Sequence, residues 1–233
     1  MGMKRGDVIS YLDMCREEGA NLQRGMNHRL RNSYSIILMS LCRGAPYADR
    51  VEDEGQILIY EGHDEPTRRG GATPKSLDQP MRYPGGRPTQ NGLFFEAASR
   101  FKQGQDTVER VKVYEKIHSG IWTYNGFFDL IDAWQEKVDR RKVFKFKLRL
   151  VEDEVQTIPV LATSTLVHGR VIPTGVKLAV WKRDKGRCVK CSSRNNLHFD
   201  HIIPFSLGGA SIVAENIQLL CVRHNLQKHD RIE

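Results

Sequence analysis

Four residues near the C-terminus constrain the fold of this chain more than any others. Cys188 and Cys191 form a C-x2-C pair, and Cys221 and His224 form a C-x2-H pair. Zn²⁺ takes four thiolate or imidazole ligands tetrahedrally, and two short pairs separated by a longer insert supply that geometry. The sequence therefore predicts a structural zinc site in the last fifth of the chain.

Between and beside the two pairs stand polar residues that a zinc site does not need. They occur in the runs L-H-F-D-H-I-I-P-F-S-L-G-G (197–209) and E-N-I-Q-L-L-C-V-R-H-N-L-Q-K (215–228). In order and spacing, residues 174–231 resemble the HNH nucleases, the ββα-metal family. A purely structural zinc knuckle remains the alternative.

The resemblance implies a role for five residues. Phosphodiester hydrolysis needs an activated water, a cation and a stabilised leaving oxygen. His201 would be the general base, and Asp200 would bind one Mg²⁺ or Mn²⁺ ion together with the side-chain oxygen of Asn225. Asn216 would fix the loop that presents His201. Lys228 would contact the scissile phosphate.

Composition supports a nucleic-acid partner. The chain has 233 residues, a net charge of +8 and a pI near 9.3, which favours a polyanion. Three of its five cysteines belong to the zinc pairs, which fits a reducing compartment. No apolar run is long enough to cross a membrane. We expect a soluble protein of the prokaryotic cytosol.

The rest of the chain predicts mainly strands, so the fold class is α+β. Short apolar or alternating runs at 34–40, 56–60, 108–114 and 142–150 indicate strands of a curved, barrel-like domain. A helix is expected at 6–19, and another at 176–185 leads into the zinc pairs. The expected domains are 1–155 and 174–233, joined by a linker at 156–173.

Residues 27–150 resemble the SRA (YDG) domain, a reader of modified cytosine. The matching runs are A-P-Y-A-D-R-V-E-D-E-G-Q-I-L-I-Y-E-G (45–62), T-Q-N-G-L-F-F-E-A (89–97) and W-T-Y-N-G-F-F-D-L-I-D-A-W (122–134). The Tyr-Asp-Gly signature of that family is altered here to Tyr124-Asn125-Gly126. SRA domains flip the modified base into a pocket between aromatic rings.

By motif position, Tyr47 and Tyr60 would stack on the base, and Asp49 would accept hydrogen bonds from the cytosine amino group. Glu52 or Asp53 could supply this carboxylate instead. Glu61 stands where the family often has a small hydroxyl residue, which leaves the preferred 5-substituent open. Both tyrosines could also be ordinary core aromatics.

The stretch Glu65–Gln90 is rich in glycine, proline and arginine. Such a long loop is often functional, and its basic residues make DNA contact the favoured interpretation over a solvated loop. The residues expected to contact DNA are Arg68, Arg69, Arg82, Arg87 and Asn91.

Together these resemblances predict a modification-dependent, type IV-like restriction endonuclease that flips 5-methyl- or 5-hydroxymethylcytosine in double-stranded DNA and cuts nearby. One HNH site cuts one strand, so we expect a homodimer at least transiently. Two alternatives remain. One is a modified-DNA-binding protein with an inactive nuclease, and the other is an HNH nickase acting on unmodified DNA or RNA.

Overall fold

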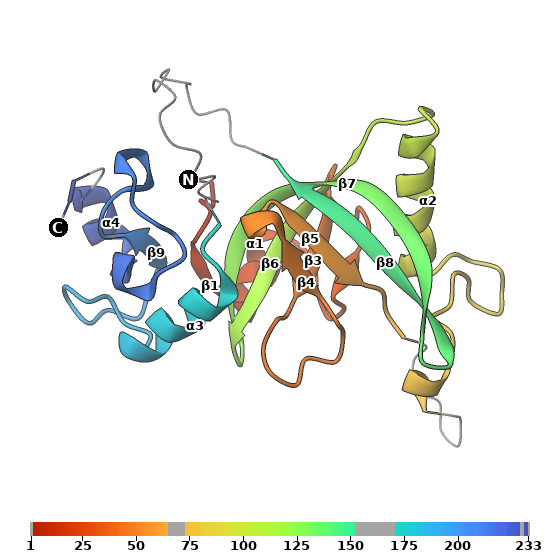
Figure 1. Ribbon diagram of the computed structural model, residues 1–233, viewed down its shortest axis with the longest axis horizontal. Coiled ribbons are helices and arrows are strands. Elements are labelled where there is room, and N and C mark those ends of the chain that lie inside the picture. Colours follow the sequence, from red (N-terminus) through yellow and green to blue (C-terminus); the bar gives the residue numbers. More distant parts are fainter. Residues whose placement is uncertain (1, 65–72, 152–170, 229–230, 233) are drawn as a thin grey trace.

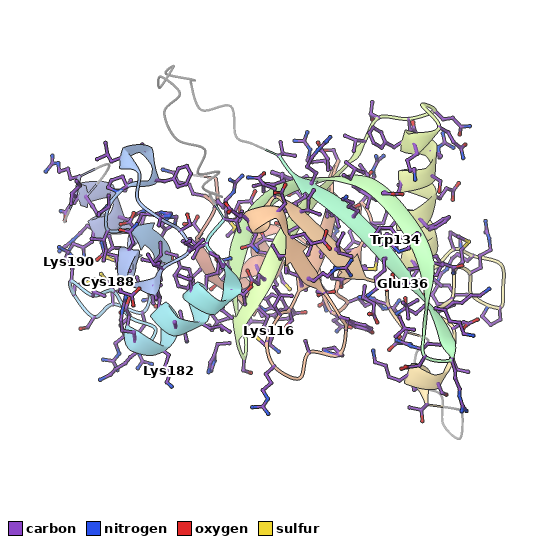
Figure 2. All side chains as sticks on the ribbon, in the orientation of Figure 1. Lys116, Trp134, Glu136, Lys182, Cys188 and Lys190 are labelled. Carbon is purple, nitrogen blue, oxygen red and sulfur yellow. The ribbon has the colours of Figure 1, made fainter. Side chains whose placement is uncertain are left out.

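The computed structural model describes residues 2–64, 73–151, 171–228 and 231–232. It has a sheet-rich part, formed by the first 150 residues, and a small C-terminal unit beside it (Figure 1). Side chains at opposite ends of the molecule illustrate its length: Cys188 lies in the C-terminal unit, whereas Trp134 and Glu136 lie at the far end of the sheet (Figure 2). Within the described residues, no helix is long and apolar enough to span a membrane.

One eight-stranded sheet dominates the first part, with the order β2-β3-β6-β7-β8-β5-β4 and with β1 paired to β7. All neighbouring strands are antiparallel except β3 and β6. The strands are β1 (Val8–Ser10), β2 (Met26–Asn27), β3 (Ser35–Met39), β4 (Arg50–Glu52), β5 (Ile57–Glu61), β6 (Glu109–His118), β7 (Ile121–Val138) and β8 (Arg141–Leu150).

The sheet is strongly curved but open (Figure 1). The expected barrel is therefore only partly correct. Among the described residues, β2 and β4 are the two ends of the strand order and do not pair with each other. A barrel requires its first and last strands to hydrogen-bond, and that closing contact is missing here.

A helix that the sequence analysis did not predict, α2 (Gln90–Lys102), covers one face of the sheet. The Thr89 hydroxyl caps it by accepting the Gly92 N–H at 3.1 Å. Phe94 and Ala98 on its inner side are fully buried, and the Phe94 ring meets Phe146 of β8 edge-on at 5.9 Å. Phe94, Ala98 and Phe146 belong to the main apolar core of the domain, together with aliphatic side chains of β3, β5, β6 and β8.

The N-terminal segment differs from the helix expected at 6–19. Only Tyr11–Glu17 is helical (α1), capped by the Ser10 hydroxyl, while Val8–Ser10 forms strand β1. Strand β1 pairs with β7, and its neighbour Asp7 forms a β-bridge with His198 of the C-terminal unit. The segment therefore ties the C-terminal unit to the sheet.

The C-terminal unit has a β-β-α order preceded by one helix. Helix α3 (Thr174–Arg183) is followed by the antiparallel hairpin β9 (Leu197–His201) and β10 (Ile217–Cys221) and by α4 (Val222–Lys228). Short 3-10 turns η1 (Asp53–Gly55), η2 (Pro74–Ser76), η3 (Phe205–Leu207) and η4 (Ala214–Asn216) lie in the connections.

The apolar core of this unit extends into the sheet. Val180 of α3, Phe199 of β9 and Leu219 of β10 pack in one buried cluster with Ile117 and Ile121 at the β6–β7 turn. Burial of this apolar surface stabilises the contact between the two parts of the molecule.

Candidate active site and nucleic-acid interface

The four expected zinc ligands lie together. Their donor atoms, on Cys188, Cys191, Cys221 and His224, are all within 4.8 Å of one another. The Cys191 and Cys221 sulfurs are 3.8 Å apart, and the Cys188 sulfur lies 3.3 Å from His224 Nδ1. A zinc ion with Zn–S bonds of about 2.3 Å separates two tetrahedral sulfurs by about 3.8 Å. This cluster could therefore hold a zinc ion.

The peptide backbone around the cluster favours the thiolate form. Burial alone would raise the pKa of Cys188, but the N–H groups of Cys221, Cys191 and Lys190 donate to its sulfur and bring the pKa to about 6. Metal ions bind the thiolate rather than the thiol. The backbone is thus arranged for a metal ligand at this position.

Asp200 and His201, at the end of β9, line one cavity of about 570 Å³. Along this strand Leu197 and Phe199 are buried, whereas Asp200 and His201 are both only partly buried. The strand ends at His201, so these adjacent residues reach one cavity despite the alternation of a regular strand. Part of the cavity wall comes from the N-terminal segment and β7, through Met3–Gly6 and Tyr124–Gly126.

His201 is oriented by a residue that the sequence analysis missed. Its Nε2 lies 2.9 Å from the hydroxyl of the buried Ser211, and Nδ1 has no hydrogen-bond partner among the described residues. Burial lowers the pKa of His201, with the nearby His198 and Lys228 acting in the same direction and Asp200 opposing them. The imidazole is therefore neutral at pH 7 and able to accept a proton.

Asn216 lies beneath the loop that follows His201. Its Oδ1 accepts the Ile203 N–H at 2.8 Å, and its Nδ2 donates to the Ala210 carbonyl at 3.0 Å. Gly209 is required in this loop because a Cβ there would lie 1.8 Å from the Ile203 carbonyl oxygen. These contacts hold both ends of the loop beside the cavity.

Lys228 is only 2% exposed, unlike the phosphate-facing residue expected from the sequence. Its ammonium lies 3.1 Å from Asp200 Oδ2 and donates to the His201 carbonyl at 2.7 Å. It therefore ties α4 to both residues at the end of β9. A lysine at this depth with a carboxylate partner is well suited to a positioning role.

Asn225 is not brought into the cavity of Asp200. It lines an adjacent cavity with His198, Asn196 and Val222. The Asp200 carboxylate is an oxygen ligand suited to Mg²⁺ or Mn²⁺, which bind few protein groups and retain several waters. The described residues thus provide one of the two expected ligands in the cavity itself.

A second cavity, of about 710 Å³, lies in the sheet domain and includes Tyr47, Asp49 and Tyr60 in its wall. His63, which the sequence analysis did not identify, lies against both tyrosines. Its ring stacks on Tyr47 at 5.4 Å with an interplanar angle of 20°, and its Nε2 lies 3.1 Å from the Tyr60 hydroxyl. Gly25 packs against the same groups, since a Cβ there would lie 2.5 Å from the Tyr60 hydroxyl oxygen.

Asp49 is the one of the three candidate carboxylates that lines this cavity; Glu52 and Asp53 are exposed on β4 and η1. Its two oxygens accept the backbone N–H groups of Ser40 at 3.2 Å and Glu61 at 3.0 Å. Burial raises the pKa of Asp49 to about 6, although these N–H groups oppose the shift. A carboxylate keeps further lone pairs after accepting two hydrogen bonds.

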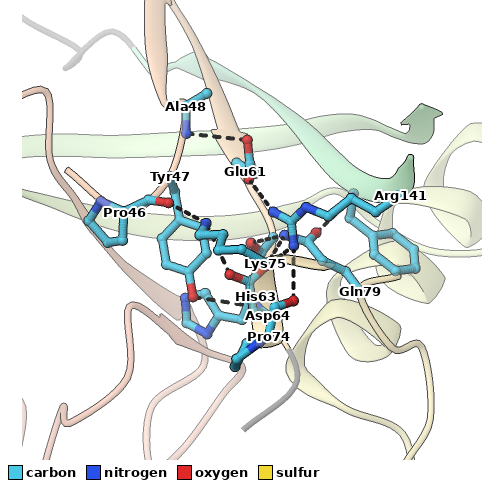
Figure 3. A network of polar contacts seen from close by, with 12 residues as sticks. Pro46, Tyr47, Ala48, Glu61, His63, Asp64, Pro74, Lys75, Gln79 and Arg141 are labelled. Carbon is cyan, nitrogen blue, oxygen red and sulfur yellow. Dashed lines mark hydrogen bonds and ion pairs between the residues drawn. The ribbon is translucent and has the colours of Figure 1, made fainter. Parts of the chain in front are cut away.

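Glu61 does not line this cavity, contrary to the expectation from motif position. It follows Tyr60 on β5, so the two side chains point to opposite faces of the strand. The Glu61 carboxylate is buried against Arg141 at 3.3 Å and Lys145 at 2.9 Å. Arg141 also pairs with Asp64, so Glu61, Arg141 and Asp64 form one charged network (Figure 3).

Asn91 also differs from its expected position. It is 1% exposed, and its side chain bonds the backbone of His63, accepting the N–H at 2.8 Å and donating to the carbonyl at 2.8 Å. It therefore fixes His63 from inside the protein, where it cannot enter a DNA groove.

The described part of the arginine-rich loop approaches the cavity wall. Arg24, which lines the cavity, donates to the Tyr83 hydroxyl at 3.0 Å, and the exposed Arg87 lies over the Tyr83 ring at 5.3 Å. Arg82 is exposed and donates to the Gly86 carbonyl. Arg68 and Arg69 lie outside the described residues.

The β-β-α unit holds both the four-ligand cluster and the Asp200–His201 pair. Residues 188–231 match the family model described as HNH endonuclease, which confirms the resemblance to the HNH nucleases. No curated protein matches the chain.

Solved structures similar to the chain include SRA domains and a restriction enzyme. One is the SUVH5 SRA domain in a methylated CHH DNA complex (19% identity, 66% of this chain and 93% of that chain, TM-score 0.47). Another is the SUVH5 SRA domain bound to fully hydroxymethylated CG DNA (20% identity, 64% of this chain and 89% of that chain, TM-score 0.42). A third is the DNA modification-dependent restriction endonuclease AspBHI (13% identity, 60% of this chain and 67% of that chain, TM-score 0.41).

Proposed function

We propose that this chain is a modification-dependent DNA endonuclease. Residues 1–155 would read a 5-modified cytosine, residues 156–173 would link the two units, and residues 174–233 would cut the DNA nearby. The observation that carries the proposal is the presence of Asp200 and His201 in one cavity of the segment that matches the HNH endonuclease model.

The cavity of Tyr47, Asp49 and Tyr60 supports base reading. Extruding a base from the duplex costs a few kcal/mol, which stacking on aromatic rings and edge hydrogen bonds must offset. Ionised Asp49 accepts from the amino group of cytosine, whereas thymine presents a carbonyl oxygen at that position and would be repelled. The reader would therefore select 5-methyl- or 5-hydroxymethylcytosine over thymine.

In the nuclease cavity, neutral His201 would take the proton of the attacking water, with Ser211 orienting its ring. Lys228 and Asn216 would hold the end of β9 and the following loop in place. Asp200 would bind Mg²⁺ or Mn²⁺, whereas Asn225, the second ligand expected from the sequence, lines the adjacent cavity. That ion would neutralise charge developing on the phosphate.

A single such cavity cuts one strand at a time. Cutting both strands would require two protomers or two successive binding events, so a homodimer on DNA belongs to the proposal. The net charge of +8 favours a polyanion partner, and double-stranded DNA is one.

A second function, a modified-DNA reader with an inactive nuclease, is favoured by one observation. Asn225 lines a different cavity from Asp200, whose carboxylate pairs with Lys228. Such a reader would bind modified DNA and leave it intact.

A cleavage assay separates the two functions. One DNA fragment is prepared with unmodified, 5-methyl-, 5-hydroxymethyl- and glucosylated cytosine and incubated with Mg²⁺ or Mn²⁺. We expect cutting of one or two modified forms only. His201→Ala should abolish cutting and retain binding, whereas His118→Ala, which changes an exposed histidine, should behave as the wild type.

Equal cutting of all four forms would refute the reader. Binding of a modified form without cutting would refute the endonuclease and favour the second function. Undiminished cutting by His201→Ala would exclude His201 as the base.

A further inference from the structure

A buried polar cluster joins the C-terminal unit to the sheet. It consists of Glu115 on β6, Asn125 on β7 and Lys177 on α3, and all three are at most 5% exposed. The Lys177 ammonium donates to Glu115 Oε2 at 2.7 Å and to Asn125 Oδ1 at 2.7 Å. Asn125 Nδ2 donates to Glu115 Oε2 at 2.9 Å, which closes the triad. We call these three residues the clasp.

The clasp explains the altered Tyr124-Asn125-Gly126 signature. At position 125 the side chain must donate to one neighbour, Glu115, and accept from the other, Lys177. An amide does both, whereas an ionised aspartate only accepts. An aspartate there would also bring a second carboxylate to about the 2.9 Å that separates Asn125 Nδ2 from Glu115, where two like charges repel.

The two charges of the clasp, on Lys177 of the C-terminal unit and Glu115 of the sheet, neutralise each other. Burial would raise the pKa of Glu115, but the charge and hydrogen bond of Lys177 hold this pKa below its usual value, so the Glu115 carboxylate stays ionised. Thr174, at the start of α3, also donates to Glu115. Removing one member of such a pair leaves an uncompensated buried charge.

Other contacts cross the same joint. The Phe199 N–H donates to the Gly6 carbonyl at 3.0 Å, next to the β-bridge between Asp7 and His198. The apolar cluster around Val180 includes Ile117 and Ile121 of the sheet, and Asp7 accepts a hydrogen bond from His198 when Nδ1 of that ring is protonated, at 2.8 Å. Apolar contacts tolerate small sliding motions, whereas a hydrogen-bonded ion pair is directional. The Gly6 and Asp7 contacts hold β9 to the N-terminal segment, whereas the clasp is a directional contact that holds α3 to β6 and β7.

Orientation matters because the nuclease cavity has walls from both sides of the joint. Asp200 and His201 come from the C-terminal unit, and Tyr124–Gly126 from β7; Asn125 and Lys177 of the clasp themselves line the cavity. A rotation about the joint would move the hydrolytic residues relative to the sheet and to any base held in it.

We propose that the clasp fixes the nuclease unit in one orientation on the reader, so that the cut falls at one distance from the modified base. This inference rests on the proposed function. Glu115, Asn125 and Lys177 act here as positioning residues, since none of them is assigned to the chemistry.

The test maps cut positions at nucleotide resolution on a duplex that carries a single modified cytosine. We expect the wild type to cut at one position per strand. Lys177→Met and Asn125→Asp should keep their affinity for the modified site but distribute cuts over several neighbouring positions. Lys182→Met, on the exposed side of the same helix (Figure 2), should cut as the wild type does.

Two results would overturn the proposal. In the first, the clasp variants cut at the wild-type positions, whatever their cleavage rate. The clasp would then contribute only stability. The other is a wild type that already cuts at scattered distances. Since Lys177→Met could unfold the joint, the double variant Glu115→Leu/Lys177→Met removes both charges while retaining buried volume, and it too should scatter the cuts.

A second readout does not depend on DNA cleavage. Spin labels are attached through a non-native amino acid at Leu12 and Ile212, which are 65% and 62% exposed on the two sides of the joint. Pulsed electron resonance should give a narrow distance distribution for the wild type and for Lys182→Met, and a broad one for the clasp variants. Distance distributions of equal width in the wild type and the clasp variants would refute the role of the clasp. This test holds even if the reader or nuclease assignment failed.

Discussion

The affinity for modified cytosine should fall about tenfold between pH 7 and pH 5 because Asp49 takes up a proton. The cytosine amino group needs an acceptor at this position, and an ionised carboxylate is the strongest acceptor available. Burial is the main cause that raises the pKa of Asp49 to about 6, and the charge of Glu61 adds to it. The group therefore titrates within the range in which the DNA duplex is stable.

The magnitude follows from the ionised fraction. A pKa of about 6 leaves about 90% of Asp49 ionised at pH 7 and about 10% at pH 5. If only the ionised form binds the base, the apparent Kd for the modified site rises about tenfold, or about 1.4 kcal/mol.

Acid unfolding of the domain would not explain this loss of affinity at pH 5. Folding raises the pKa of Asp49 from its ordinary value to about 6, so the folded state holds this proton more tightly than the unfolded chain does. Its contribution to the free energy of unfolding is therefore largest below the unfolded pKa and is lost as the pH rises through about 6. Acidification to pH 5 stabilises this part of the fold while it weakens base recognition.

Fluorescence anisotropy measures the effect with His201→Ala, which we expect to bind DNA without cutting it. The ratio of affinities for a singly methylated and an unmodified duplex is followed from pH 8 to pH 5 at constant ionic strength, since phosphate contacts depend on salt. Asp49→Asn should give a lower ratio that no longer varies with pH. Glu52→Gln, which changes an exposed carboxylate paired with Arg50, should retain the wild-type profile.

A ratio that stays constant with pH in the wild type would refute this reasoning. An unchanged pH profile in Asp49→Asn would assign the titration to another group.

Two further predictions concern the nuclease unit. Cys221→Ser should abolish zinc binding and unfold the C-terminal unit, because structural zinc contributes on the order of 10 kcal/mol to such folds; metal analysis and thermal melting check this, with Cys42→Ser as a control outside the cluster. Gly209→Ala should lower the cleavage rate at least about tenfold at unchanged zinc content and modified-DNA affinity, because its Cβ would lie 1.8 Å from the Ile203 carbonyl oxygen. A normal rate would show that the loop adapts without disturbing His201.

The sequence could predict the parts of the site that depend on local spacing. The two ligand pairs, Cys188 with Cys191 and Cys221 with His224, each lie within one turn of chain, and their donor atoms meet in the structure. Adjacent Asp200 and His201 share a cavity because the strand ends there. The alternation of apolar and basic residues at 142–150 predicts a strand, and the observed strand β8 begins one residue earlier.

The sequence could not predict which lysines and glutamates are buried. Lys145 and Glu61, 84 positions apart, look like solvent-facing charges on strands, but they pair inside the protein. The same holds for Asn91, which was expected in a groove and instead holds the backbone of His63. Hydropathy patterns assign charges to the surface, so pairings between distant strands stay hidden.

Closure of the sheet was unpredictable for a related reason. Alternation shows that a segment is a strand and which side chains share a face, but not which strand lies at an edge. In the structure β3 and β6 pair in parallel, although 69 residues separate Met39 from Glu109. The resulting strand order places β2 and β4 at opposite ends of an open sheet.

The buried charges share one property that bears on function. Buried ion pairs add little stability over apolar residues of the same size, but they are directional. Here they occur where position matters for the proposed chemistry: Lys228 holds Asp200, and Lys177 holds the joint between the two units. Glu61, fixed by Lys145, presents the backbone N–H that orients Asp49. Geometry at the three places is thus set by pairs whose members come from distant parts of the chain.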